Sequence, residues 1–308
     1  MSTVADVADQ IVRNLRGVSG RDRATALNGA VSTADLQATI DADVSDLVVA
    51  GTGATLEVGF EIMQVVAAST NLLTVSRAED GTTAALHADN SKVTVEPRWP
   101  RQLVADEMRH EVESWPEDLW EVQTAALAWP ADSRAVDSGL SISGNQRAYR
   151  ILGAERAHTS AAKYGYKQPE LRLIRNISDA TFTSGYAVQT VGPIVYGEAV
   201  TVDVVYAVSF DTDTWATSTE LDGAGGVFVD APNPRQLLDI LVWGTGARML
   251  RWRAAGRVDL DRQGQSRHPD EVPPDMLVGT AREWERVRDR RIKEEVARLH
   301  DQYPPEFG

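Results

Sequence analysis

Between residues 46 and 96 the chain consists of short apolar runs interrupted by turn residues. The runs are rich in β-branched residues and read LVVA, ATLEV, EIMQVVAA, NLLTVSR and KVTVE. The residues that separate them are Gly51-Thr-Gly53, Gly59, Ser69-Thr-Asn71 and Asp80-Gly81. β-branched residues favour strands, and Gly, Asn and Asp favour tight turns. The segment therefore predicts a small antiparallel β unit, either a meander or a small barrel.

A second β region follows the first. Its candidate strands are DLWEVQTAALA, SGLSIS, AYRILGAERA, ELRLIRNI, YAVQTV and AVTVDVVYAVSF. Apolar and polar residues alternate clearly in the last strand, at Val200, Val202, Val204 and Tyr206. Six strands with such turns predict a β-sandwich.

Apolar stripes at helical spacing predict helices over residues 4–16, 100–115, 234–256 and 275–300. Gly17 and Gly20 should end the first helix, and Asn233 should cap the third. The fold class is therefore α+β. We predict an N-terminal helix with a connecting segment, a small β domain, a linking helix, a β-sandwich domain and a C-terminal helical region with an extended tail, at residues 1–45, 46–98, 99–116, 117–225 and 226–308.

Charge and composition restrict the function classes. The net charge is −14, and no dominant basic run exists for wrapping nucleic acid. The absence of cysteine excludes disulfides and thiolate chemistry. No apolar stretch approaches the roughly 18 residues of a membrane helix, and the N-terminus lacks a signal-peptide pattern. We expect a soluble protein, made in the cytoplasm, that does not engage a membrane.

The charge is uneven along the chain. Residues 1–246 hold 18 basic and 33 acidic residues, whereas residues 247–300 hold 13 basic and 10 acidic residues. The basic C-terminal part is interpreted either as a solvated, salt-bridged helix face or as a surface that docks on an acidic partner.

No catalytic or metal-binding motif emerges. The histidines lack metal-ligand spacing and are expected to be surface residues: His87, His110, His158, His268 and His300. Gly244-Thr-Gly246 lacks the frame of a phosphate loop and is interpreted as a site of close helix packing. The carboxylates of Glu107 and Glu111 are expected to be solvated. We expect no enzyme activity, no cofactor and no metal.

Tryptophan is concentrated near the second helix and in the C-terminal helices, where core packing accounts for most of it. Tryptophan and arginine are also enriched at protein interfaces. The interface candidates are Trp243, Arg248, Arg251, Trp252, Arg253, Trp284, Arg288, Arg291, Tyr303 and Phe307.

One pattern in the small β unit resembles a known module. It comprises Glu61-Ile-Met63-x-Val65, then Val75-Ser-Arg77-Ala-Glu-Asp80-Gly81-Thr82, then His87 and Pro97-Arg98-Trp99-Pro100. This resembles structural proteins of tailed phages that infect actinobacteria, although Ala78 stands where glycine is usual, so the turn is expected to be less tight. The C-terminal part is also similar to such proteins, with its Arg/Trp-rich helix, PDEVPP linker, Arg/Glu helix and Tyr-Pro-Pro-x-Phe end.

The resemblance covers about half the chain, at residues 46–115 and 234–308, and its C-terminal part is similar to head-to-tail connector (adaptor) proteins. It implies a homo-oligomeric, dodecameric ring at the head–tail junction of the virion. The ring would bind the portal protein above and the next neck or tail protein, a stopper or tail terminator, below. DNA would pass through the ring without sequence-specific binding, consistent with an acidic wall that repels phosphates.

Within the motif, the residues Glu61, Met63, Arg77, Asp80, Gly81, Thr82 and His87 are interpreted as structural. Gly81 should supply turn geometry, Asp80 should cap the turn, and Arg77 should pair with Glu61 across strands.

Three alternatives stay open at this stage. The chain could be a tail or baseplate subunit, or a glycan- or receptor-binding β-sandwich protein that uses Tyr164, Tyr166 and Tyr186. A hydrolase is the weakest alternative, because Ser141-Ile-Ser-Gly144 lacks the frame of a nucleophile elbow.

Overall fold

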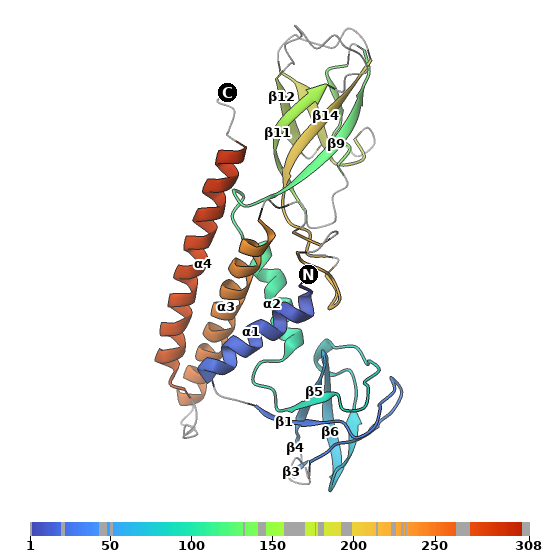
Figure 1. Ribbon diagram of the computed structural model, residues 1–308, viewed down its shortest axis with the longest axis vertical. Coiled ribbons are helices and arrows are strands. Elements are labelled where there is room, and N and C mark those ends of the chain that lie inside the picture. Colours follow the sequence, from blue (N-terminus) through green and yellow to red (C-terminus); the bar gives the residue numbers. More distant parts are fainter. Residues whose placement is uncertain are drawn as a thin grey trace. The chain divides into compact units, whose positions relative to one another are not determined.

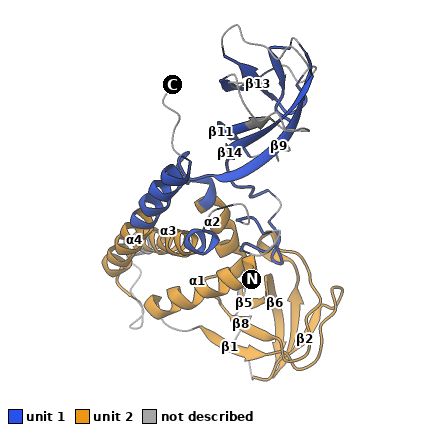
Figure 2. Cartoon of the chain, turned by 45° about the horizontal axis from the view of Figure 1, so that its top comes forward, with its two compact units in different colours: residues 1, 112–238, 290–308 blue, residues 2–111, 239–289 orange. Residues whose placement is uncertain are grey.

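The computed structural model describes a large part of the chain, namely residues 2–19, 22–42, 48–49, 52–131, 133–140, 146–156, 170–175, 177, 182–191, 199–213, 215–222, 226–228, 231, 233–262 and 272–303. Within these residues it has four α-helices and antiparallel β-sheets, which confirms the α+β class (Figure 1). The chain divides into two compact units, shown in Figure 2. The barrel unit holds residues 2–111 and 239–289, and the sandwich unit holds residues 1, 112–238 and 290–308.

The sheet of the barrel unit is antiparallel and has the strand order β1-β8-β5-β6-β7-β2. Its strands are β1 (Arg23–Ala26), β2 (Gln37–Thr39), β5 (Thr55–Val58), β6 (Glu61–Ser69), β7 (Leu72–Ser76) and β8 (Lys92–Val95). A bridge between Leu27 and Ile40 joins the two edges, so the sheet closes on itself. Closure removes the exposed edges of the sheet. Two very short strands, β3 (Val48–Val49) and β4 (Thr52–Gly53), pair beside it.

The barrel confirms the predicted small β unit but corrects its boundary. Strands β1 and β2 precede residue 46, where the β domain was predicted to begin. They were missed because each has three or four residues and little apolar character. Their contribution is to close a core of buried aliphatic side chains, among them Leu27, Ile40, Leu56, Met63, Leu73, Val75 and Val93.

The first helix, α1 (Val4–Ser19), buries its predicted stripe of Val4, Val7, Ala8, Ile11, Val12 and Leu15. Thr3 and Asp6 form a reciprocal cap: the Asp6 amide donates to Thr3 Oγ1 at 3.2 Å, and the Thr3 amide donates to Asp6 Oδ2 at 3.0 Å. The helix passes the predicted stop at Gly17. Its last turn is held by the buried Ser19, whose hydroxyl donates to Leu15 O at 3.0 Å and accepts from Trp99 Nε1 at 2.7 Å.

The second helix, α2 (Arg101–Glu113), is tied to the barrel through its N-terminus. The buried carboxylate of Glu57, from β5, accepts the Arg101 amide at 2.5 Å. A carboxylate at this position accepts a hydrogen bond from an otherwise unpaired amide, and its negative charge interacts favourably with the positive end of the helix dipole. Burial nevertheless raises the pKa of Glu57 to about 6.

The last two helices, α3 (Pro234–Arg262) and α4 (Pro274–Gln302), lie side by side in Figure 1. Asn233 caps α3 as predicted, because its Oδ1 accepts the Gln236 amide at 3.4 Å. The helix continues past Gly256, where the sequence predicted its end. One glycine costs a helix only about 1 kcal/mol, which is not enough to end it.

Two glycines of α3 allow close packing within the barrel unit, as predicted. A Cβ at Gly244 would lie 2.2 Å from the Glu111 carboxylate of α2. A Cβ at Gly246 would lie 2.4 Å from the ring of Trp284 on α4. A Cβ at either position would require the Glu111 or Trp284 side chain, or the helix that carries it, to shift.

The sandwich unit holds two three-stranded antiparallel sheets, with orders β11-β14-β9 and β10-β13-β12. Their strands are β9 (Glu121–Trp129), β10 (Ala135–Asp137), β11 (Ala148–Arg156), β12 (Leu171–Arg175), β13 (Tyr186–Thr190) and β14 (Val200–Val208). Side chains from both sheets share one core, which includes Trp129, Val188, Val202, Val204 and Tyr206. This arrangement confirms the predicted sandwich.

One predicted strand of the sandwich was misplaced. The sequence run SGLSIS begins at Ser138, whereas the observed strand β10 ends at Asp137. Gly139 has a φ of 64°, a left-handed conformation that ends the extended backbone there. Residues 141–143 of the same run lie outside the described part.

Replacing Gly246 with alanine should lower the stability of the protein by about 1–3 kcal/mol, because the new methyl group overlaps the Trp284 ring. Gly256→Ala is the matched control, since a Cβ at Gly256 meets nothing within 4 Å. It should raise stability by about 0.5–1 kcal/mol through helix propensity. Urea unfolding of both variants measures the two effects. Stabilisation by both substitutions would contradict close packing at Gly246.

Candidate functional site

The residues of the sequence motif converge on one buried carboxylate in the barrel. Glu61 is the first residue of β6, and its side chain is 0% exposed. It accepts two hydrogen bonds from Arg77, from Nε at 2.5 Å and from Nη2 at 2.7 Å. It also accepts the Ala85 amide at 2.9 Å, the Ala78 amide at 3.3 Å, and a bond to His87 Nε2 at 2.8 Å. The predicted pairing of Arg77 with Glu61 is thus confirmed. We call this set the Glu61 network.

The guanidinium of Arg77 also fixes the backbone of two loops. Its Nη1 donates to Ser32 O at 2.6 Å and to Asp35 O at 3.1 Å. Its Nη2 donates to Ala85 O at 2.7 Å. One planar group therefore joins the loop before β2 to the loop before β8. Only arginine presents enough donors in a fixed fork for this task.

The electrostatics of Glu61 favour its charged form. Burial by itself raises the pKa of Glu61, but the hydrogen bonds from Arg77, the Ala85 amide and His87 outweigh it and lower the pKa to about 2. The hydrogen bond to Glu61 also raises the pKa of Arg77. The pair is therefore a stable ion pair at neutral pH. Such a carboxylate is poorly suited to act as a general base.

Three other motif residues have structural roles, as predicted. Met63 is buried in the barrel core. Gly81 lies in the 3-10 turn η2 (Glu79–Gly81) with a φ of 76°, which confirms its turn geometry. Thr82 holds this turn against β6: its Oγ1 accepts the Ile62 amide at 3.1 Å and donates to Glu79 O at 2.8 Å.

Three expectations about the motif need correction. Asp80 was expected to cap the turn, but the carboxylate that forms a hydrogen bond there belongs to Glu79, which accepts from Ser76 Oγ. Asp80 is exposed, and its backbone is left-handed, with a φ of 52°. His87 is not a surface residue but is 7% exposed, because Glu61 binds its ring. Ala78 keeps the left-handed conformation that glycine would favour, with a φ of 57°, so the turn does not relax.

A second buried carboxylate connects the helices of the barrel unit. Glu111 of α2 was expected to be solvated, yet its side chain is 2% exposed and accepts Arg288 Nε of α4 at 2.5 Å. It occupies the space that Gly244 leaves open on α3. Nearby, Glu107 pairs with Arg248 at 2.9 Å. The sequence signal that could have revealed the burial of Glu111 is the pair of glycines, Gly244 and Gly246, inside the apolar helix α3.

Several interface candidates of the barrel unit have partners within the unit. The rings of Trp243 and Trp284 meet edge to face at 5.4 Å, and Arg253 lies over Trp99 at 5.1 Å. Arg251 pairs with Glu285. These contacts assign packing and ion-pair roles to them. Trp252, by contrast, is 63% exposed.

The remaining interface candidates belong to the sandwich unit. Arg291 pairs with Glu294 at 3.0 Å on an exposed part of α4. Tyr303 is half-buried just beyond the end of α4, and its amide donates to Leu299 O at 2.8 Å. Phe307 lies outside the described residues.

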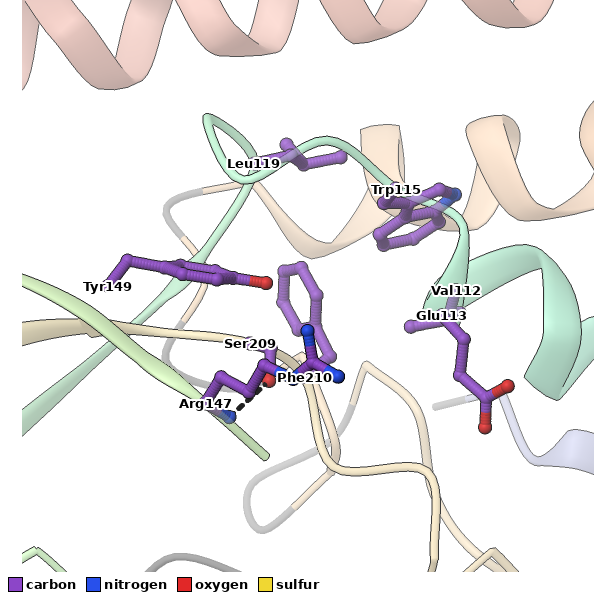
Figure 3. A pocket seen from close by; sticks show the side chains of 8 residues that line it. All are labelled: Val112, Glu113, Trp115, Leu119, Arg147, Tyr149, Ser209 and Phe210. Atoms are coloured by element: carbon purple, nitrogen blue, oxygen red, sulfur yellow. Dashed lines mark hydrogen bonds between the residues drawn. The ribbon is translucent and has the colours of Figure 1, made fainter. Parts of the chain in front are cut away.

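The sandwich unit also has an aromatic pocket, with a volume of about 370 Å³. Its lining residues are Val112, Glu113, Trp115, Leu119, Arg147, Tyr149, Ser209 and Phe210. In Figure 3 the ring of Phe210 lies between those of Trp115 and Tyr149, and Arg147 and Glu113 bring opposite charges to the lining. Burial raises the pKa of Tyr149, so its hydroxyl stays protonated. The pocket could hold a flat or apolar group with a polar edge.

Of the three tyrosines proposed for glycan binding, one lies among the described residues. Tyr186 packs against the sandwich core, and its hydroxyl accepts the Ala148 amide at 3.4 Å. Tyr164 and Tyr166 lie outside the described residues.

The described residues contain no cluster of three or more side chains suited to a metal ion. Likewise, no helix in this part of the chain combines the length and apolar character needed to cross a membrane. Comparison with models of known protein families found no match, and comparison with curated proteins found none either.

The Glu61 charge should make the barrel unit sensitive to acid. The pKa of Glu61 is about 2 in the folded chain and about 4.5 when unperturbed, so its stabilisation is complete above pH 4.5 and is lost as the pH falls toward 2. The loss amounts to about 3 kcal/mol. Glu61→Gln should remove this pH dependence and lower stability at neutral pH by about 3–5 kcal/mol, because Arg77 stays buried without its counter-charge.

Urea unfolding of the wild type and Glu61→Gln from pH 2 to pH 7 measures this effect. Glu96→Gln is the matched control, since it removes one exposed carboxylate from the same barrel. An unchanged acid slope in Glu61→Gln would contradict the assigned charge state.

Ala78→Gly should stabilise the protein by about 1 kcal/mol, because glycine adopts the left-handed backbone without the steric cost that alanine has. Ala88→Gly, at an exposed position without positive φ, should instead lose about 0.4–1 kcal/mol through backbone entropy. Thermal unfolding compares the two variants. A loss of stability in both would mean that the turn carries no strain at Ala78.

Proposed function

We propose that the chain is a structural subunit of the neck of a tailed-phage particle, an adaptor that assembles into a ring between the portal protein and the next neck or tail component. The observation that carries this proposal is the Glu61 network. Among the residues that resemble the phage module, Arg77 and His87 both bind the buried carboxylate of Glu61. The residues of the resemblance thus form a hydrogen-bond network that fixes the fold of the small β unit. Related structural modules are expected to share such a network.

The helical part is consistent with docking on a partner. α3 and α4 carry the basic excess of the chain, with 13 basic and 10 acidic residues over positions 247–300. Several of their arginines are substantially exposed, including Arg251 and Arg290, whose side chains are 56% and 65% exposed. In the proposed ring these helices approach the portal protein, and the acidic remainder of the chain repels DNA in the channel.

A second candidate function is binding of a glycan or receptor through the sandwich. The aromatic pocket of Trp115, Tyr149 and Phe210 favours it, since aromatic faces bind the apolar faces of ligands that also carry polar groups. A glycan array with the wild type and Trp115→Ala tests this candidate. A tail or baseplate subunit is the other alternative within the particle.

Electron microscopy of the purified chain, alone and mixed with its portal protein, tests the neck assignment. We expect rings that stack on the portal, and the number of subunits gives the symmetry, with twelve as the expected count from the resemblance. A monomer that ignores the portal and binds tail proteins would instead support the tail or baseplate alternative.

A further inference from the structure

Two exposed leucines lie on the loops that the Glu61 network fixes. Leu36 is 60% exposed and Leu86 is 71% exposed. Each directly follows a carbonyl that Arg77 holds: Asp35 O at 3.1 Å and Ala85 O at 2.7 Å. Because one guanidinium binds both carbonyls, the two loops lie close together. Both leucines are thus displayed on a rigid support.

The backbone around these leucines is further restrained. Leu36 O accepts the Val75 amide at 2.9 Å, and His87 exchanges two backbone hydrogen bonds with Val31, both at 2.9 Å. Apolar side chains at the tip of an unrestrained loop would lose conformational entropy on binding. Here that entropy has already been lost on folding. We call Leu36 and Leu86 the barrel patch.

A second pair of exposed apolar side chains lies on the helices of the same unit. Trp252 of α3 and Met276 of α4 are each 63% exposed. The two helices are antiparallel, and Gly246 faces Trp284, so residue 252 lies opposite residue 278. Trp252 and Met276 are therefore at nearly the same height. Successive residues of an α-helix are rotated by about 100° about its axis. Counted from the Gly246–Trp284 contact, this rotation places the side chains of Trp252 and Met276 on the same side of the helix pair. We call them the helix patch.

The surroundings of the two patches have complementary charge. Residues 22–99, which include the barrel, hold 11 acidic and 4 basic residues, a net charge of −7. Asp35, Asp80 and Asp89 are exposed near the loops of the barrel patch. On the helix side, Arg248, Arg251 and Arg253 lie within one helical turn of Trp252, and the side chains of Arg248 and Arg251 are 40% and 56% exposed. Opposite charges favour encounter of the two surfaces, and the like negative charge of two barrels disfavours contact between them.

We propose that the barrel patch of one copy of the chain binds the helix patch of a second copy, with Leu36 and Leu86 packed against Trp252 and Met276. The contact is head-to-tail, so each copy uses both patches with two different neighbours. Repetition of such a contact closes into a ring when the rotation between copies permits it. The inference rests on the ring of the proposed function and names its subunit contact.

The absence of cysteine makes cross-linking a direct test. Leu86→Cys and Trp252→Cys are introduced into the full chain, separately and together, at exposed positions that should not disturb folding. A short bis-maleimide then links thiols that lie close together. We expect no covalent dimer from either single variant, a dimer from their mixture, and a ladder of oligomers from the double variant.

Val66→Cys combined with Arg286→Cys is the matched control, since these residues are also exposed on the barrel and on α4 but belong to neither patch. A ladder no stronger than that of the control, or self-linking of Leu86→Cys alone, would overturn the proposed contact. Electron microscopy of the same samples separates the two proposals. Rings without cross-links reject the contact only, whereas a ladder without portal binding rejects the neck role only.

Discussion

A single buried carboxylate determines how the loops of the barrel are arranged. Glu61 is inaccessible to water, and its cost of burial is offset by donors from Arg77, His87 and two backbone amides. Removing one partner from such a network leaves the others buried and unpaired, so its members depend on one another. The loops before β2 and β8 are fixed because their carbonyls complete the hydrogen bonding of Arg77.

A buried ion pair also fixes the helices of the barrel unit. Glu111 is buried against Arg288, and Gly244 provides the space for it. A buried ion pair contributes little net stability, but it disfavours arrangements that leave either charge alone. The carboxylates of Glu61 and Glu111 thus specify the geometry of the barrel unit more than they stabilise its fold. A chain without cysteine obtains its rigidity from such pairs and from packing.

The sequence predicted the element types well and the boundaries less well. Periodicity located the four α-helices of the described residues, and alternation located β14, because these signals extend over many residues. The short strands β1 and β2 carry too few residues for such a signal, and their role depends on closure through the Leu27–Ile40 bridge. Of the site, the Arg77–Glu61 pair was predicted, whereas the burial of His87 and Glu111 follows from tertiary contacts that no local pattern encodes. The exposure of Leu36 and Leu86 likewise could not be predicted from the sequence.

The most direct test of the central claim, that the Glu61 network holds the loops rigid, is the hydrogen-exchange rate of the Ala85 amide. This amide belongs to an exposed residue outside any strand, and its hydrogen bond is to Glu61 at 2.9 Å. We expect protection comparable to that of the amides of β6 and β7, and a loss of that protection in Arg77→Lys. Exchange at the rate of an unstructured loop in the wild type would contradict the claim.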